Sequence, residues 1–402
     1  MSAAIYIDYL PGQLRAVCVE DDSIHDLLVI RDDKPVYIGN KYSGRIVAID
    51  KGLDAAFVEI GLDIPGFLPR NEIPKSIRDQ GLSEGQYLSV IVTREGADGK
   101  GVKLRAFLET PEDKKVCLLD APDPLLRWLS RLSTVDLEDI YVTDAMISRR
   151  IKGALAGLDR EYKNVRLVAD KPHLFEINGF EEALEVLLQV DVPLPSGGSL
   201  IIEQGRTLTA IDVNKGSMQH NGGAEKLHYE LNLEAAREIA RQLRLRNIAG
   251  RILIDFTSMK SMDHRKNLQA ILKAELKLDY AGHKLFPLYH SGIQELTRKR
   301  AGRSLQELLL RPIGIGGLGQ VPDPYTQVFT ALRKYWAISS SSLSQTHNPK
   351  TPRIMASPSV INILKNSVAR AYVEDRIGYS VLCVEECLFD DGMQSADYRV
   401  EV

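Results

Sequence analysis

Two apolar stretches of the chain each end in an aspartate, and this pattern predicts a pair of carboxylates at one edge of a sheet. Asp212 follows Leu208–Ile211, and Asp255 follows Ile252–Ile254. A carboxylate at the end of a strand lies at the rim of an open α/β layer, where ligands bind. On neighbouring strands the two carboxylates would converge, and their repulsion is costly unless a cation lies between them. Mg²⁺ suits two carboxylates, with water and phosphate in its other positions, and Mn²⁺ is the alternative cation.

A metal held by these two acids predicts phosphodiester hydrolysis, because it would activate water and neutralise charge on the phosphate. Asn214, two residues after Asp212, faces the same side of the strand and would orient an acid or the phosphate. The alternative is that each aspartate forms a turn or caps a helix, the usual role of a single Asp at a strand end. Two acids in matched contexts weaken this alternative but leave it open.

A predicted helix between the two aspartates carries a row of arginines. Over residues 233–246 the apolar side chains recur at helical spacing, and Arg237, Arg241 and Arg244 lie on another face. Arginines beside an acidic site could bind phosphates in a bidentate manner. The equally weighted alternative is a solvated charged face balanced by Glu234 and Glu238.

Residues 35–109 contain short β-rich runs separated by Gly, Pro, Asp and Asn, and this spacing predicts an OB-type closed barrel. Phe57 lies in one predicted strand, Phe67 begins the next, and Lys100 precedes the last. Aromatic side chains that stack on bases, with cations nearby for phosphates, are typical of single-stranded nucleic-acid binding. The alternative, favoured for an anonymous barrel, is that both phenylalanines belong to its core.

Composition describes a soluble globular protein of several domains. The 402 residues are 44% hydrophobic and 26% charged, with a formal net charge of -3. No apolar run is long enough for a membrane helix, and Asp8 interrupts the first apolar stretch, so we expect neither a membrane anchor nor a secretory signal. Four scattered cysteines without a CxxC pair suit a reducing compartment, and we expect a cytoplasmic protein; these are Cys18, Cys117, Cys383 and Cys387.

These motifs, taken together, resemble the bacterial ribonuclease E/G family. NKYSGRI, AAFVEIG and GFLP are similar to its RNA-binding barrel, and LPSGGS, TAIDVN, NLEAAREIARQLRLR and ILIDF are similar to its catalytic part. The resemblance implies that the acids matching Asp212 and Asp255 bind Mg²⁺, supported by the asparagine matching Asn214. It also implies that the aromatics matching Phe57 and Phe67 contact RNA, together with a lysine equivalent to Lys100.

The resemblance also implies a mixed α/β multidomain fold. A ribonuclease-H-like domain would be interrupted by the barrel, followed by a deoxyribonuclease-I-like catalytic subdomain and then a linker with a small C-terminal domain. The expected boundaries are 1–34 and 110–190 for the first domain, 35–109 for the barrel, 191–310 for the catalytic subdomain, and 311–402 for the remainder.

Four departures from the family pattern are visible. Arg311 and Gly314 replace the cysteines of its zinc-sharing CPxC motif, so we expect no structural zinc and no zinc-linked tetramer, although an ordinary homodimer is allowed. The segment that reads the 5′ end of RNA is missing. Ser258 replaces the second acid of a DFxDM pattern, and YHSG at residues 289–292 replaces SRFG. The first two changes affect assembly and regulation, and the last two affect the catalytic rate.

The sequence therefore favours a cytoplasmic, metal-dependent endoribonuclease whose partner is single-stranded RNA. A second hypothesis is an RNA-binding module of the same fold with weak or lost nuclease activity, favoured by the drift at Ser258 and YHSG. A phosphoesterase acting on DNA or small phosphates is a third. Retention of Asp212, Asn214 and Asp255 separates the first from the second, and the barrel separates both from a small-molecule enzyme.

Overall fold

The computed structural model describes residues 3–96, 99–109, 114–132, 137–155, 164–168, 174–218, 223–313, 319–342, 352–385 and 398–401. The chain divides into two compact units: residues 1–34, 132–189 and 304–402 form the first, and residues 35–131 and 190–303 form the second. None of the helices in the described ranges is long and apolar enough to cross a membrane. The predicted mixed α/β fold is confirmed.

The first unit is built on a five-stranded sheet with the order β11-β10-β1-β2-β3. Strands β1 (Ala3–Leu10), β2 (Gln13–Glu20) and β3 (Ser23–Arg31) form an antiparallel meander, which β10 (Leu137–Val142) and β11 (Asn164–Leu167) extend in parallel. The sequence predicted the first two strands of the meander but not the third. The helices of this region are α3 (Ala145–Leu155), α4 (Leu174–Ile177) and α5 (Phe180–Val186).

The C-terminal part of the first unit packs around the long helix α9 (Pro324–Ser342), whose Leu332, Tyr335 and Trp336 are buried. It is preceded by α8 (Leu305–Leu309) and the hairpin of β18 (Leu310–Ile313) with β19 (Gly319–Pro322). Around it lie α10 (Pro358–Lys365), α11 (Val368–Ile377) and the sheet β21 (Leu382–Glu385), β20 (Arg353–Ala356), β22 (Tyr398–Glu401). Arg311 lies in β18, whereas Gly314 is outside the described residues.

A buried ion-pair cluster joins helix α9 to the first two strands. Arg333 Nε donates to Asp8 Oδ2 at 2.6 Å, and Arg15 donates to Asp8 and to Glu181 at 2.7 Å. Burial alone would raise the pKa of Asp8, but the guanidiniums of Arg333 and Arg15 more than offset this and hold it below its ordinary value. These acids are therefore neutralised by protein side chains.

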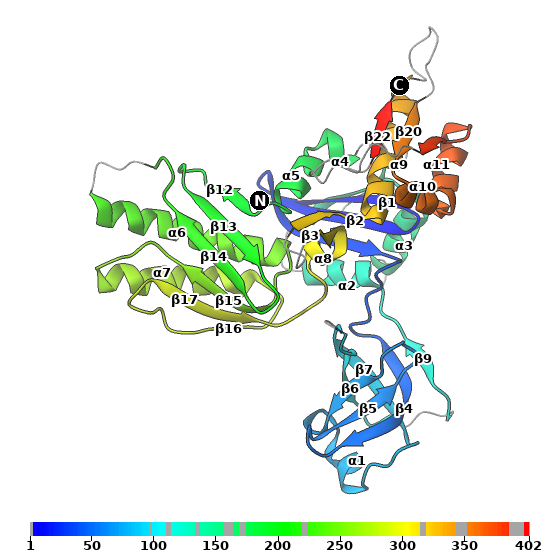
Figure 1. Cartoon of the computed structure of the whole chain (residues 1–402), viewed down its shortest axis with the longest axis horizontal. Coiled ribbons are helices and arrows are strands. Elements are labelled where there is room, and N and C mark those ends of the chain that lie inside the picture. The colour runs from blue at the N-terminus through cyan, green and yellow to red at the C-terminus, as the bar shows by residue number, and fades with distance from the viewer. Residues whose placement is uncertain are drawn as a thin grey trace. The chain divides into compact units, whose positions relative to one another are not determined.

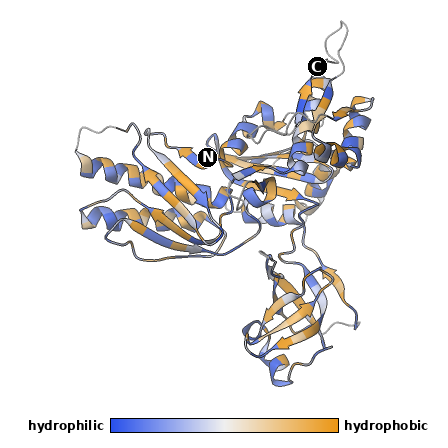
Figure 2. Ribbon diagram, viewed as in Figure 1, coloured by the Kyte–Doolittle hydropathy of each residue, from blue (hydrophilic) through white to orange (hydrophobic). Residues whose placement is uncertain are grey.

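The N-terminal part of the second unit is a closed barrel. Strands pair in the order β5-β6-β8-β7-β4, and a pairing of β4 with β5 closes the ring. Its core consists of aliphatic side chains such as Ile46, Val58 and Leu104. Hydrophobic residues recur along the barrel strands (Figure 2). The strands are β4 (Lys41–Asp50), β5 (Ala55–Glu59), β6 (Gly66–Pro69), β7 (Tyr87–Arg94) and β8 (Lys103–Ala106), with β9 (Cys117–Asp120) added beside β4. The short helices are η1 (Arg70–Glu72), α1 (Lys75–Asp79) and α2 (Pro124–Arg131).

The C-terminal part of the second unit is an α/β layer with the strand order β12-β13-β14-β15-β17-β16. Helices α6 (Ala224–Leu245) and α7 (Met262–Glu275) lie side by side along this sheet (Figure 1), and η3 (Leu276–Leu278) continues α7. The strands are β12 (Asp191–Pro193), β13 (Ser199–Gln204), β14 (Thr209–Asn214), β15 (Gly250–Asp255), β16 (His283–Leu285) and β17 (Ile293–Arg298). The sequence predicted β13, β14, β15 and both helices, but not β12, β16 or β17.

Candidate active site

Asp212 and Asp255 lie directly beside each other on neighbouring strands. Strands β14 and β15 are parallel, and their register pairs these two residues. Neighbouring strands are about 4.8 Å apart, so the carboxylates can reach one point. Both aspartates are exposed, whereas Ile211 and Ile254, next to them in sequence, are buried in the helix-covered core. The acids therefore project from the sheet face that α6 and α7 leave open.

Asn214 orients one of the two carboxylates. Its side-chain Nδ2 donates a 2.8 Å hydrogen bond to Asp212 Oδ2. Strand β14 continues to Asn214, so Asp212 lies inside the strand, and the two side chains share one face because they are two residues apart. This contact fixes the orientation of Asp212 and leaves its other oxygen for a ligand.

A tight turn closes the site beside Asp255. Gly292 has a φ of +99°, and a Cβ placed on it would lie 2.5 Å from Phe256 O and 4.0 Å from Asp255 Oδ1. Its amide donates to Tyr289 O at 3.1 Å, and Tyr289 N donates to Ile293 O at 2.9 Å. Only glycine fits this approach and this backbone conformation. The turn of residues 289–292 is therefore held against the second aspartate.

Helix α6 also holds the loop that follows Asp255. The fully buried Asn232 donates from Nδ2 to Thr257 O at 2.8 Å and accepts from Thr257 N at 3.1 Å. One turn earlier, His228 Nδ1 lies 2.9 Å from Ser258 O. Residues 228 and 232 share a helix face. The loop is thus fixed at successive turns of one helix.

Glu225, at the start of α6, anchors the end of the same loop. Its carboxylate accepts from Lys260 N and Ser261 N at 3.0 Å, and His264 Nδ1 lies 3.0 Å from it. The two backbone hydrogen bonds, followed by the one with His264, lower the pKa of Glu225 to about 2. These bonds stabilise the fold fully at a pH above the ordinary pKa of a glutamate. Their contribution is lost as the pH falls toward the lowered pKa of about 2, where the carboxylate takes up a proton. His264 stacks on Tyr229 with ring centroids 4.0 Å apart.

The carboxylate pair fits a hard divalent cation that keeps several waters. Within the described ranges, no group of three or more His, Cys, Asp or Glu side chains could hold a metal ion. A dedicated zinc or calcium cage normally needs such a group. Mg²⁺ is commonly held by only one or two carboxylates together with substrate phosphate. Asp212 and Asp255 are suited to this kind of binding.

The three predicted arginines lie on α6, which covers the sheet face opposite the aspartates. Arg241 forms a 2.8 Å ion pair with Glu238, Arg237 lies 3.9 Å from Glu275, and Arg244 is buried. Their role in phosphate binding stays an untested prediction. The placement favours the alternative in which these charges are balanced within the helical layer.

Phe57 and Phe67 form an aromatic pair outside the barrel core. They face each other across β5 and β6, with ring centroids 5.9 Å apart. Both rings are half-buried, and neither belongs to the buried core cluster of the barrel. This placement favours a surface role over the alternative of core residues, and the contact of the rings with RNA stays a prediction.

Sequence reasoning missed two cations on β8, of which Lys103 lies beside this aromatic pair. Lys103 is the strand partner of Phe67, and Lys103 and Arg105 both donate to Glu72, at 2.7 and 2.8 Å. These contacts lower the pKa of Glu72. Alternation along β8 was the signal, since residues 103 and 105 share its outer face. Lys100 is exposed in the preceding loop, where Gly101 permits close approach to Pro65 O.

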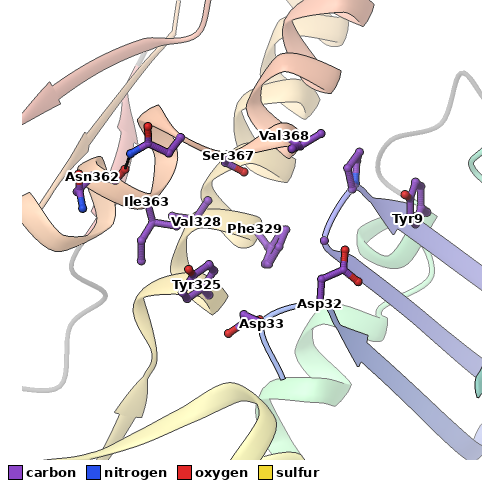
Figure 3. A pocket seen from close by; sticks show the side chains of 13 residues that line it. Tyr9, Asp32, Asp33, Tyr325, Val328, Phe329, Asn362, Ile363, Ser367 and Val368 are labelled. Atoms are coloured by element: carbon purple, nitrogen blue, oxygen red, sulfur yellow. Dashed lines mark hydrogen bonds between the residues drawn. The ribbon is translucent and has the colours of Figure 1, made fainter. Parts of the chain in front are cut away.

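A separate cavity of about 420 Å³ lies in the first unit (Figure 3). Tyr325, Val328 and Phe329 from α9 line it, together with Asp32 and Asp33 after β3. None of the predicted site residues lines this cavity. It is distinct from the aspartate pair.

Comparison with known proteins identifies the family. The sequence profile of the ribonuclease E/G family matches residues 103–301, and that of the S1 RNA binding domain matches residues 36–106. Ribonuclease G of Salmonella typhimurium is 25% identical over 486 aligned positions, covering 97% of this chain and 98% of the relative. Because the aligned positions outnumber the 402 residues of this chain, the relative contains segments that are missing here.

Two further relatives carry related names. A putative ribonuclease E of Buchnera aphidicola is 26% identical over 74% of this chain and 94% of its own length. Ribonuclease E of Escherichia coli is 26% identical over 73% of this chain but only 36% of its own length. Residues 36–106 thus form an S1-type, OB-like RNA-binding domain. The chain belongs to the ribonuclease E/G family.

Proposed function

We propose that this protein is a metal-dependent endoribonuclease that hydrolyses phosphodiester bonds in single-stranded RNA. The observation that carries the proposal is the register pairing of Asp212 with Asp255 on an open sheet face, with Asn214 bonded to the first carboxylate. The names of the relatives, which are ribonucleases, support the same activity.

The finer fold assignments are part of this proposal. A ribonuclease-H-like domain agrees with the strand order β11-β10-β1-β2-β3, in which two parallel strands extend an antiparallel meander. A deoxyribonuclease-I-like subdomain agrees with the layer of β12–β17 and its two helices. We also propose a cytoplasmic location, which the free thiols of Cys18, Cys117 and Cys383 support.

Each residue of the site has a separate task. Asp212 and Asp255 would hold Mg²⁺, and Asn214 keeps Asp212 in the orientation that this requires. When bound, Mg²⁺ would supply Lewis acidity toward water and toward a phosphate oxygen. The contacts of Asn232 with Thr257 and the turn of residues 289–292 hold the backbone beside the second carboxylate, so that little reorganisation would be needed during the reaction.

Substrate capture is assigned to the S1-type barrel. Phe57 and Phe67 would stack on unpaired bases, and Lys100 and Lys103 would contact phosphates. Stacking needs bases that are not paired, so the barrel favours single-stranded segments.

A binding module with weak or lost turnover is the second candidate. Ser258 takes the place of the second acid in the family pattern, and its side chain is exposed in the loop after Asp255. The two candidates differ in one measurable property, because only the enzyme needs the aspartate pair for turnover.

The test measures cleavage of a labelled single-stranded RNA in Mg²⁺. Asp212→Asn and Asp255→Asn should each lower the rate roughly a hundredfold or more, because losing metal-assisted charge stabilisation costs several kcal/mol of barrier. Glu203→Gln is the matched control, since Glu203 is an exposed carboxylate of the same sheet that faces Ala210. Near wild-type cleavage by either aspartate variant would refute the site. No cleavage by the wild-type protein, with RNA binding intact, would support the binding module.

A further inference from the structure

Arg265 and His290 form a contact that the family motifs do not explain. Arg265 Nη1 lies 3.0 Å from His290 Nδ1, although the two residues are 25 positions apart. A guanidinium has no acceptor, so Nδ1 must accept and a neutral imidazole carries its proton on Nε2. The pair therefore offers guanidinium donors and one imidazole donor side by side.

The pair lies at the same end of the sheet as Asp255. Arg265 is in the first turn of α7, which begins shortly after β15, and His290 is at the tip of the turn between β16 and β17. That turn is held against Asp255 through Gly292. Two residues of chain span at most about 7 Å, so His290 lies close to the carboxylate pair.

Arg265 differs from the arginines on α6. Among the described residues it forms no ion pair with a carboxylate, and its only other hydrogen-bond contact is a 3.6 Å approach of Nη2 to Met262 Sδ. Arg241, in contrast, is paired with Glu238. His290 is exposed, and Arg265 is half-buried. The packing therefore holds the guanidinium in place while leaving its charge for an anion.

A cation near Asp212 and Asp255 would help RNA to bind there. Two carboxylates repel the RNA backbone, and a guanidinium beside them offsets this repulsion for the neighbouring phosphate. Arginine binds phosphate through charge-assisted, directional hydrogen bonds. The imidazole adds a donor and fixes the guanidinium through Nδ1.

We propose that Arg265 and His290 form a binding subsite for an RNA phosphate next to the one held at Asp212 and Asp255. This proposal rests on the proposed function for the identity of the ligand. It also gives a role to the YHSG segment, whose sequence differs from the family pattern. The subsite would hold internal phosphates of a single strand and would not require a free 5′ end.

The experiment measures binding of a labelled single-stranded RNA to the full-length Asp255→Asn protein in Mg²⁺ over a range of salt concentrations. Arg265→Ala should weaken binding by about tenfold and lower the steepness of log Kd against log salt by about 0.7, the value for one phosphate contact on a single strand. His290→Ala should weaken binding by a smaller factor. Arg265→Lys should keep the salt dependence, because it keeps the charge.

Lys266→Ala is the matched control, because Lys266 is an exposed cation at the next position of α7. Equal changes for Arg265→Ala and Lys266→Ala would show a general charge effect and overturn the subsite. Unchanged binding by Arg265→Ala would overturn it as well. Cleavage by the wild-type protein is measured in parallel: if it is absent while Arg265→Ala still weakens binding, the subsite stands and the proposed hydrolysis does not.

Discussion

At the scale of single residues, the site depends on two like charges that the fold can tolerate without a metal. Two carboxylates about 5 Å apart repel each other by only on the order of 1 kcal/mol in water, whereas the same pair in a dry interior would be far more costly. Asp212 and Asp255 are exposed on the open face of the sheet. We therefore expect the protein to fold without Mg²⁺, and we propose that the cation serves the reaction and not the folding.

Asn214 is expected to act through Asp212. Asn214→Ala removes a 2.8 Å hydrogen bond to a carboxylate, and such bonds contribute about 1.5–3 kcal/mol. Because Asn214 is half-exposed, we expect the lower end of this range: roughly a tenfold loss of cleavage rate and a higher Mg²⁺ concentration at half-maximal activity. Titration of activity with Mg²⁺ measures both.

Ser199→Ala is the control for this prediction, because Ser199 is the strand partner of Asn214 on β13. The variant should keep the rate and the Mg²⁺ requirement of the wild-type protein. If Asn214→Ala loses rate but reaches half-maximal activity at the wild-type Mg²⁺ concentration, Asn214 acts on the phosphate and not through Asp212.

At the scale of elements, helix α6 has two tasks on two parts of its surface. Its buried positions Ala235, Ile239 and Leu243 pack on the sheet, and its N-terminal half holds the loop after Asp255 through Glu225, His228 and Asn232. The spacing of these three residues, three and then four positions apart, follows one helix face. The helix is thus packed in the core and also holds the loop that follows the second aspartate.

Asn232→Ala tests this connection. It leaves the backbone groups of Thr257 without their side-chain partner, at a cost of about 1–3 kcal/mol for each unsatisfied buried group. We expect a clear fall in melting temperature and a fall in cleavage rate, with RNA affinity at the barrel unchanged. Thermal unfolding and single-turnover cleavage measure the two effects. Lys226→Ala, an exposed change on the same helix, should alter neither; a full cleavage rate in Asn232→Ala would show that the loop does not position Asp255.

Substitutions on the barrel surface are expected to change RNA affinity without changing the melting temperature. Phe57→Ala or Phe67→Ala should weaken single-stranded RNA binding by about 1–3 kcal/mol for each base that stacks on the ring. The melting temperature should change little, because neither ring belongs to the barrel core. Leu53→Ala, at an exposed apolar position of the barrel, is the control for loss of surface area alone. A large fall in melting temperature with unchanged affinity would contradict the stacking role.

The sequence was informative where local pattern decides the structure. Apolar runs that end in Asp212 and Asp255 form paired parallel strands, and Phe57 and Phe67 face each other as barrel residues should. The short strands β16 and β17 lack a clear alternation of apolar residues, so the turn that carries His290 could not be placed. The burial of Arg244 could not be read from helical periodicity either, because it depends on packing between α6 and its surroundings.

At the scale of the whole molecule, the chain between the barrel and the next domain is short. Strand β8 ends at Ala106 and β10 begins at Leu137. Within the described part of this interval, β9 joins the barrel sheet beside β4, and α2 is only eight residues long. So few residues cannot form an independent domain with its own core. We therefore infer that the described part of this interval holds no counterpart of the segment with which family members are expected to read the 5′ end of RNA.

A nuclease without such a segment should bind RNA directly at internal single-stranded sites. We expect nearly equal cleavage rates for one RNA prepared with a 5′-monophosphate, a 5′-triphosphate or a 5′-hydroxyl, and for its circular form. The internal phosphate subsite at Arg265 and His290 predicts the same result, because it does not distinguish end groups. Side-by-side cleavage of the four substrates at limiting RNA measures the ratio. A tenfold preference for the monophosphate corresponds to about 1.4 kcal/mol of discrimination. A preference of this size that is lost in Arg265→Ala would show that this subsite has taken over recognition of the 5′ end.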